Sequence, residues 1–320
     1  MTGEAKVPDM TSDMSRRDFL KQGALVGAAA AALRAAETLG AVAGSQPVSQ
    51  AASAPAGALP SIKLGDLEVS RLILGSNPFF GYSHRDDLGK KMKEYFTDER
   101  IVAVLDDAAS HGITAVAAPP YGQWTKLFPK YVEGGGKLRI WLAQMDGATE
   151  KMKEDITAAV KVGAKAVFIQ GRKVDEQFSR NSFDTVRAWV EHIRTLNVPA
   201  GMASHRPDVH LEAQKQKFPV DFYFQCFYNG NSFRDEERQK AVETIAKLEK
   251  PVVAYKVLGA GRMPPEVGLA FAFRHLRKTD GVCVGVYPKD DPDQVKEDAE
   301  LVEKFTKSPP TQPASEPARA

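Results

Sequence analysis

The chain has 320 residues, a formal net charge of +2 at pH 7 and two cysteines. A near-neutral balance with no basic block beyond the N-terminus excludes nucleic acid as a partner. Two cysteines are too few for a disulfide scaffold.

The first 43 residues resemble a twin-arginine signal peptide. Arg16 and Arg17 precede Phe-Leu, an alanine-rich apolar stretch covers 23–33, and residues 41–43 read Ala-Val-Ala, a small-x-small cleavage pattern. The apolar stretch is about half of the ~20 residues that span a bilayer. No cysteine lies nearby for a lipid anchor. We predict export to the periplasm by the twin-arginine machinery, without a stable membrane anchor; the alternative is an ordinary amphipathic helix.

Two further segments have the composition of unfolded chain. Residues 44–60 are rich in Ser, Ala, Pro and Gly, which is typical of a linker. Residues 307–320 include four prolines and are predicted to be a disordered tail. The folded domain is thus predicted to span 61–306, close to the ~250 residues of one (β/α)8 barrel.

Within this domain a small hairpin is predicted at 61–69, turning at Gly65-Asp66, and short apolar strands then alternate with helical patterns. The strands are predicted at 71–75, 113–118, 138–145, 165–171, 200–205, 220–228, 251–259 and 282–287. The helices are predicted at 98–110, 126–132, 149–162, 182–196, 207–216, 235–248, 265–277 and 292–305, with Ser182 as an N-cap. Residues 76–95 are predicted to be a long loop. This order indicates a closed (β/α)8 TIM barrel with its chemistry at the C-terminal strand ends.

Four stretches resemble the aldo-keto reductases. They are the hairpin and Val-Ser-x-Leu-x-Leu-Gly strand at 64–75, the Gly-Ile and Tyr-Gly pairs within 112–122, and the strands at 200–205 and 221–229. The resemblance implies an oxidoreductase that uses NADP, with Tyr121 as the catalytic tyrosine. It also implies that Gln225 contacts nicotinamide. Gly259, Gly261 and Lys289 would lie where the family holds the cofactor phosphates.

The rest of the family's catalytic set is absent. Its aspartate falls on Val116, its lysine near Gln144 and its histidine on Gly171. Without a neighbouring cation, a tyrosine that titrates near ~10 is a poor acid at neutral pH. The pair that clamps the nicotinamide amide is replaced at 203–204 by Ala-Ser. We therefore expect any NADP binding to be weak and the active site to differ from the family's.

Other polar residues lie at the predicted strand ends. Lys256 lies in an otherwise apolar strand, where burial would lower its pKa and make the amine a nucleophile or base. We expect its head group to open into the main pocket near His205 and Gln225; the alternatives are contact with a ligand phosphate or pairing with a carboxylate. His205 is a second catalytic candidate, or else a cap for the following helix. The residues predicted to bind substrate are Asn77, His84, Gln144, Gln170 and Arg172.

Other sites have little support. No spaced histidine cluster indicates a metal, although His84, Asp146 and His205 could converge. The histidines on predicted helices, which we place at the surface, are His111, His192, His210 and His275. Both cysteines lie on predicted strands that are not neighbours, which favours two buried thiols.

Three hypotheses follow for the function. The first is an exported enzyme that acts on a small carbonyl or sugar-like substrate with a non-standard active site. The second is a cofactor-independent lyase or isomerase that uses His205 and Lys256. The third is a non-catalytic ligand-binding protein.

Overall fold

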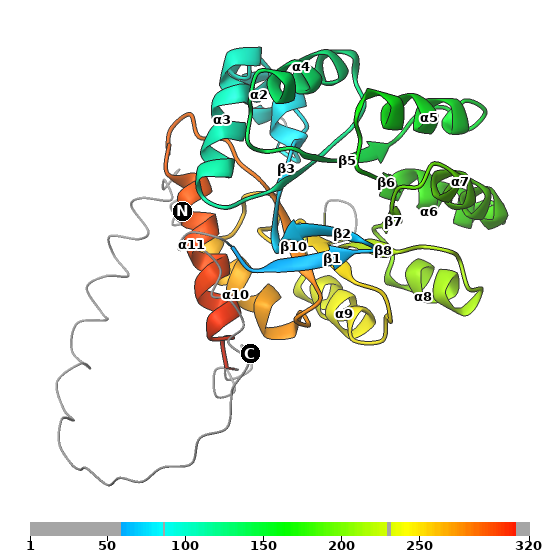
Figure 1. Cartoon of the computed structure of the whole chain (residues 1–320). Coiled ribbons are helices and arrows are strands. Elements are labelled where there is room, and N and C mark those ends of the chain that lie inside the picture. The colour runs from blue at the N-terminus through cyan, green and yellow to red at the C-terminus, as the bar shows by residue number, and fades with distance from the viewer. Residues whose placement is uncertain (1–58, 86, 229–231, 312–320) are drawn as a thin grey trace, which may run out of the picture. The chain divides into compact units, whose positions relative to one another are not determined.

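The computed structural model describes residues 59–85, 87–228 and 232–311. The predicted signal peptide, nearly all of the linker and most of the tail lie outside these residues. The predicted barrel is confirmed. Eight parallel strands close in the order β10-β3-β4-β5-β6-β7-β8-β9, and helices surround them (Figure 1).

The strand bounds agree with the predicted ones to within a few residues. The strands are β3 (Leu72–Gly75), β4 (Ala115–Ala118), β5 (Ile140–Met145), β6 (Ala166–Ile169), β7 (Ala200–Ser204), β8 (Phe222–Cys226), β9 (Val252–Tyr255) and β10 (Gly281–Gly285). The helices are η1 (Asn77–Phe80), α2 (Leu88–Tyr95), α3 (Asp98–Ser110), α4 (Gly122–Glu133), α5 (Met152–Val162), α6 (Gly171–Ser179), α7 (Phe183–Thr195), α8 (Pro207–Lys215), α9 (Asp235–Ile245), α10 (Pro265–His275) and α11 (Gln294–Lys307).

Alternation along each strand divides the core in two. In β8, Phe222 and Phe224 point into the barrel, whereas Tyr223 packs outward against the helices. Phe168 of β6 stacks on Phe224 with ring centroids 4.2 Å apart, so aromatic side chains fill the barrel axis. The interior is therefore a packed core, and ligands are restricted to the strand ends.

The predicted hairpin is confirmed as β1 (Ser61–Leu64) and β2 (Leu67–Ser70). Its turn uses Gly65 at φ 66, a conformation that glycine adopts without steric cost. Leu64 and Val69 are buried in the interior cluster. Gly65 lies against Asp221 and Pro199, which precede β8 and β7. The hairpin thus closes the N-terminal end of the barrel.

Several predicted details were wrong. The segment 76–95 is not a loop, because it forms η1 and α2, and helix α6 was missed altogether. Only Met92 is buried in α2, so its sequence lacks a clear apolar stripe. Ser182 precedes α7 but makes no capping hydrogen bond with its side chain.

The two cysteines lie on either side of one tyrosine. Tyr255 of β9 pairs with Cys226 of β8 and with Cys283 of β10, and both thiols are free. Cys226 is buried as predicted, whereas Cys283 is half-buried. Burial raises the pKa of Cys226 to about 11 and that of Cys283 to about 12. Both side chains therefore carry a neutral thiol.

Candidate functional site

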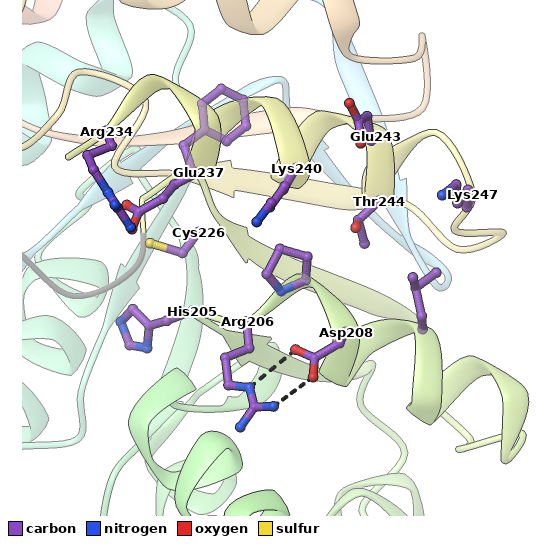
Figure 2. Close-up of a pocket in the computed structure, with 13 residues that line it drawn as sticks. His205, Arg206, Asp208, Cys226, Arg234, Glu237, Lys240, Glu243, Thr244 and Lys247 are labelled. Carbon is purple, nitrogen blue, oxygen red and sulfur yellow. Dashed lines mark hydrogen bonds and ion pairs between the residues drawn. The ribbon is translucent and has the colours of Figure 1, made fainter. Parts of the chain in front are cut away.

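The candidate site lies where β7 and β8 end. His205 and Cys226 open into a cavity of about 480 Å³ that runs between α8 and α9 (Figure 2). The residues that line it are His205, Arg206, Pro207, Asp208, Leu211, Cys226, Phe227, Arg234, Glu237, Lys240, Glu243, Thr244 and Lys247. The groove therefore connects the C-terminal edge of the barrel with its side.

His205 is held by a carboxylate. Its Nδ1 lies 2.9 Å from Oδ2 of Asp175, which also accepts the His205 backbone N–H at 3.1 Å. The hydroxyl of Ser204 donates to the other Asp175 oxygen at 2.5 Å. A carboxylate can only accept, so Nδ1 carries a proton, and in the neutral form of the ring Nε2 has the free lone pair. The geometry thus prepares Nε2 to take a proton from a ligand.

The His205 ring fills space that a side chain at 171 would need. A Cβ on Gly171 would lie 3.1 Å from Nδ1 and Cε1 of His205 and 3.0 Å from the hydroxyl of Tyr255. The resemblance places the family's histidine at this position. Glycine here lets a histidine from the next strand take up that volume. Tyr255 lies beside it, with ring centroids 5.9 Å apart, and burial keeps its hydroxyl protonated by raising its pKa.

Tyr121 is surrounded by acceptors, and no cation of the described residues is among the groups that shift its pKa. Its hydroxyl donates to Asp146 at 2.6 Å and lies 2.9 Å from the hydroxyl of Tyr82. Burial, followed by the hydrogen bond to Asp146, raises the pKa of Tyr121 well above its ordinary value. The family's tyrosine needs the opposite shift to act as an acid. Within the part of the chain that the structure describes, Tyr121 therefore lacks the neighbouring cation that would lower its pKa, as the sequence predicted, and its hydroxyl is held by Asp146.

Lys256 lies just beyond the end of β9, in the left-handed region at φ 58. The strand ends one residue earlier, so alternation no longer fixes where its side chain points. Burial lowers the pKa of Lys256, and Cys226, Arg262 and Glu237 are its electrostatic neighbours. No carboxylate of the described residues pairs with it, and it does not line the cavity between α8 and α9. The expected opening of Lys256 into that cavity is therefore not seen.

Gln225 faces away from the barrel mouth. It is fully buried, and its Oε1 lies 2.8 Å from Nδ1 of His210 while its Nε2 donates to the carbonyl of Cys226. His210 was placed at the surface by the sequence, which is wrong: it is completely buried on α8. Burial lowers the pKa of His210 to about 4. This pair holds α8 against β8.

The predicted substrate-binding residues differ in their exposure and in their contacts. Asn77 and Arg172 are exposed, and Gln144 is half-buried at the end of β5. Gln170 accepts a hydrogen bond from the Lys173 N–H and so caps α6. His84 packs on Phe233 of the loop after β8, with ring centroids 5.7 Å apart. None of these five residues lines the cavity between α8 and α9.

The residues predicted to hold NADP have different surroundings. Gln225 cannot reach nicotinamide from its buried position, and Lys289 is exposed. Tyr287, at the end of β10, packs against Tyr95 and Phe96 with ring centroids 5.2 and 6.0 Å away. The segment between β3 and α3 therefore covers part of the strand end where the resemblance places the cofactor phosphates. Gly259 and Gly261 have positive φ and shape a tight turn in the loop after β9.

Asp175 and Tyr255 were missed from the sequence. Asp175 lies on α6, which was not predicted, and only the fold brings that helix against the end of β7. Tyr255 precedes Lys256 in the predicted strand. Its side chain packs with the interior cluster of the barrel, and a strand alternation that pointed Tyr255 inward would have placed it at the barrel mouth. In the described ranges, no three His, Cys, Asp or Glu side chains are placed to hold a metal ion. No described helix has the length and apolarity to cross a membrane.

Comparison with known proteins supports the fold. No family model and no curated protein matches the chain in sequence. Two solved structures from Pseudomonas aeruginosa, each provisionally named an aldo-keto reductase, have a TM-score of 0.55. One is 18% identical and covers 79% of this chain and 98% of its own. The other is 19% identical and covers 76% of this chain and 94% of its own.

This chain has the fold of an aldo-keto reductase. At such low identity the similarity defines the barrel and leaves its chemistry to be argued from the site. The glycine at 171 and the surroundings of Tyr121 and Gln225 distinguish this barrel from the pattern that the resemblance implies.

Proposed function

We propose that this protein is a cofactor-independent enzyme of the lyase or isomerase class that acts on a small hydroxylated carbonyl compound. His205 is its general base. The observation that carries the proposal is the hydrogen bond between Asp175 and His205 Nδ1, at 2.9 Å, at the end of a barrel strand. A carboxylate that fixes the tautomer of a histidine is typical of general-base sites.

The proposed step is a proton transfer. Nε2 of His205 takes a proton from the carbon next to the substrate carbonyl, and the electron pair of that C–H bond forms an enediolate. The imidazolium that results is stabilised by Asp175. In an isomerase it returns the proton to the former carbonyl carbon, while the hydroxyl proton moves from the old hydroxyl oxygen, which becomes the new carbonyl, to the old carbonyl oxygen, which becomes the new hydroxyl. In a lyase, the electron pair of the enediolate instead expels a leaving group from the neighbouring carbon, and the imidazolium gives its proton to that leaving group. No redox partner is needed for either outcome.

Lys256 is the second group that we assign to this chemistry. Burial lowers the pKa of Lys256, and its electrostatic neighbour Cys226 lines the cavity together with His205, although Lys256 itself does not. We infer that the Lys256 amine donates a hydrogen bond to the carbonyl of a bound substrate. Lys256→Met keeps a similar volume, so we expect a folded barrel with strongly reduced turnover. Activity equal to that of the parent protein would remove Lys256 from the site.

Solvent exchange at carbon tests the proposal. The protein is incubated in D2O with small hydroxyketones and hydroxyaldehydes, and the loss of the C–H signal next to the carbonyl is followed by NMR. We expect exchange that falls about 10²–10⁴-fold in His205→Asn and in Asp175→Asn. Circular dichroism checks that both variants fold. Absence of exchange across the panel, together with NADPH-dependent reduction of the same compounds, would overturn the proposal in favour of a reductase.

A further inference from the structure

The groove between α8 and α9 has a charge pattern that the proposed function does not explain. Four basic and three acidic side chains line it. Two of the basic groups are already engaged. Arg206 makes hydrogen bonds to both carboxylate oxygens of Asp208, at 3.2 and 2.7 Å, and Arg234 lies 3.7 Å from Glu237. Because each of these pairs is close to neutral, neither would attract a charged ligand strongly.

Two lysines of the groove remain without a carboxylate among the described residues. Lys240 lies on α9, and Lys247 lies just beyond its last residue, seven positions further on. Both lysines line the same groove. Figure 2 shows the Lys240 side chain extending from α9 into the groove, with Lys247 farther from His205. The third acid, Glu243, is engaged by the amide of Gln239 at 3.2 Å.

The groove is also a built feature with fixed walls. Gln214 of α8 donates to the carbonyl of Lys247 at 3.1 Å and accepts the Glu249 N–H at 2.8 Å. These hydrogen bonds tie the far end of α8 to the end of α9. At the near end, His205 and Cys226 belong to the same cavity. The groove thus joins the general base to two unpaired cations, while Leu211 and Phe227 give it an apolar lining.

We propose that the substrate is an anion whose carboxylate or phosphate group lies at Lys240 and Lys247 while its reacting carbon lies at His205. This proposal rests on the proposed function and names its substrate class. The lysine ammonium is a point charge on a flexible side chain. It can therefore bind a carboxylate or phosphate without the fixed bidentate geometry that an arginine requires. The groove volume of about 480 Å³ lies within the range of small-molecule pockets.

Calorimetric binding of three probes to the whole chain tests this assignment. Gluconate and sorbitol have the same length of carbon chain and differ in charge, and inorganic phosphate tests the other anionic group. We expect gluconate or phosphate to bind, sorbitol not to bind, and added salt to weaken binding.

Lys240→Gln should weaken anion binding about fivefold, and the double variant with Lys247→Gln more than tenfold.

Lys161→Gln is the matched control, because Lys161 is exposed on α5 and makes no ion pair with a described residue. Equal binding of sorbitol and gluconate, loss of affinity in Lys161→Gln equal to that in Lys240→Gln, or no binding of either anion at tens of millimolar would overturn the proposal.

His205→Asn separates this proposal from the function on which it rests. It should lower carbon exchange about 10²–10⁴-fold and keep anion binding. Lysine-dependent anion binding without exchange in the parent protein would leave the anion site in place and remove the proton-transfer function. Carbon exchange of neutral hydroxyketones that does not depend on Lys240 would support the proton-transfer function and remove the anion site.

Discussion

A histidine at this barrel mouth comes from the end of β7 and not from the end of β6. The histidine can come from β7 because position 171, at the end of β6, is glycine and leaves room for its ring. Asp175, one helical turn beyond Gly171 on α6, then holds the ring of His205. The residue that makes room and the residue that orients the ring thus belong to the same short segment. A side chain at 171 would compete directly with the general base.

Gly171→Ala is therefore expected to harm the site more than the fold. The new methyl group would lie 3.0 Å from the Tyr255 hydroxyl and 3.1 Å from the His205 ring, tighter than ordinary contacts. We expect a loss of about 1–3 kcal/mol in the free energy of unfolding and displacement of His205. Urea denaturation and the exchange assay measure the two effects. Gly122→Ala is the control, since its Cβ would have no neighbour within 4 Å.

His210 should make stability depend on pH. Burial lowers its pKa in the fold from 6.5 to about 4, so the unfolded chain binds a proton more readily. The contribution of neutral His210 to the free energy of unfolding is complete above pH 6.5. It is lost as the pH falls toward 4, by about 3 kcal/mol in total. Urea denaturation at pH 7 and at pH 4.5 measures this loss. His210→Asn should remove that part of the pH dependence, and an unchanged slope would contradict the assignment.

At the scale of elements, the fold could be predicted better than the site. The eight strands and their order could be recognised because each is a short apolar run with polar flanks. Helices α2 and α6 could not, since α2 buries only Met92 and α6 contains the polar run around Asp175. Their positions depend on packing against other elements. Asp175 therefore became a site residue only when tertiary structure was known.

One buried ion pair fixes how α10 passes into β10. Asp280 has no exposed side-chain surface and accepts from Arg277 and from the Val252 N–H at 2.9 Å. Asp280→Ala would leave the guanidinium and the start of β9 without their acceptor. We expect the free energy of unfolding to fall by about 3–5 kcal/mol in denaturant titrations. Asp290→Ala, at an exposed position, should change it by about 0.5 kcal/mol or less.

At the scale of the molecule, repetition made the sequence informative. Strand and helix alternate eight times, and this regularity predicted a closed barrel despite errors at single boundaries. The residues of the candidate site do not recur from one strand–helix unit to the next. It depends on which side chains meet at one sector of the mouth, and that meeting involves β7, β8 and α6, which are separated in the sequence. The barrel therefore followed from local patterns, whereas the Asp175–His205 pair did not.

The N-terminal segment carries a prediction of its own. Replacing Arg16 and Arg17 by lysine should prevent passage through the twin-arginine machinery, because that pathway reads the arginine pair. The substitutions lie outside 61–306, so the barrel should unfold at the same temperature as before. Cell fractionation with antibody detection measures the distribution. Periplasmic accumulation equal to that of the parent chain would contradict the signal assignment.

The free thiols on either side of Tyr255 have a consequence for where the protein can mature. The sequence contains no other cysteine, so the barrel is complete without any oxidative step. Their raised pKa values keep them as slow-reacting neutral groups even where oxidants are abundant. The same native structure can therefore form in a reducing compartment and persist in an oxidising one, with no need for a disulfide isomerase on either side.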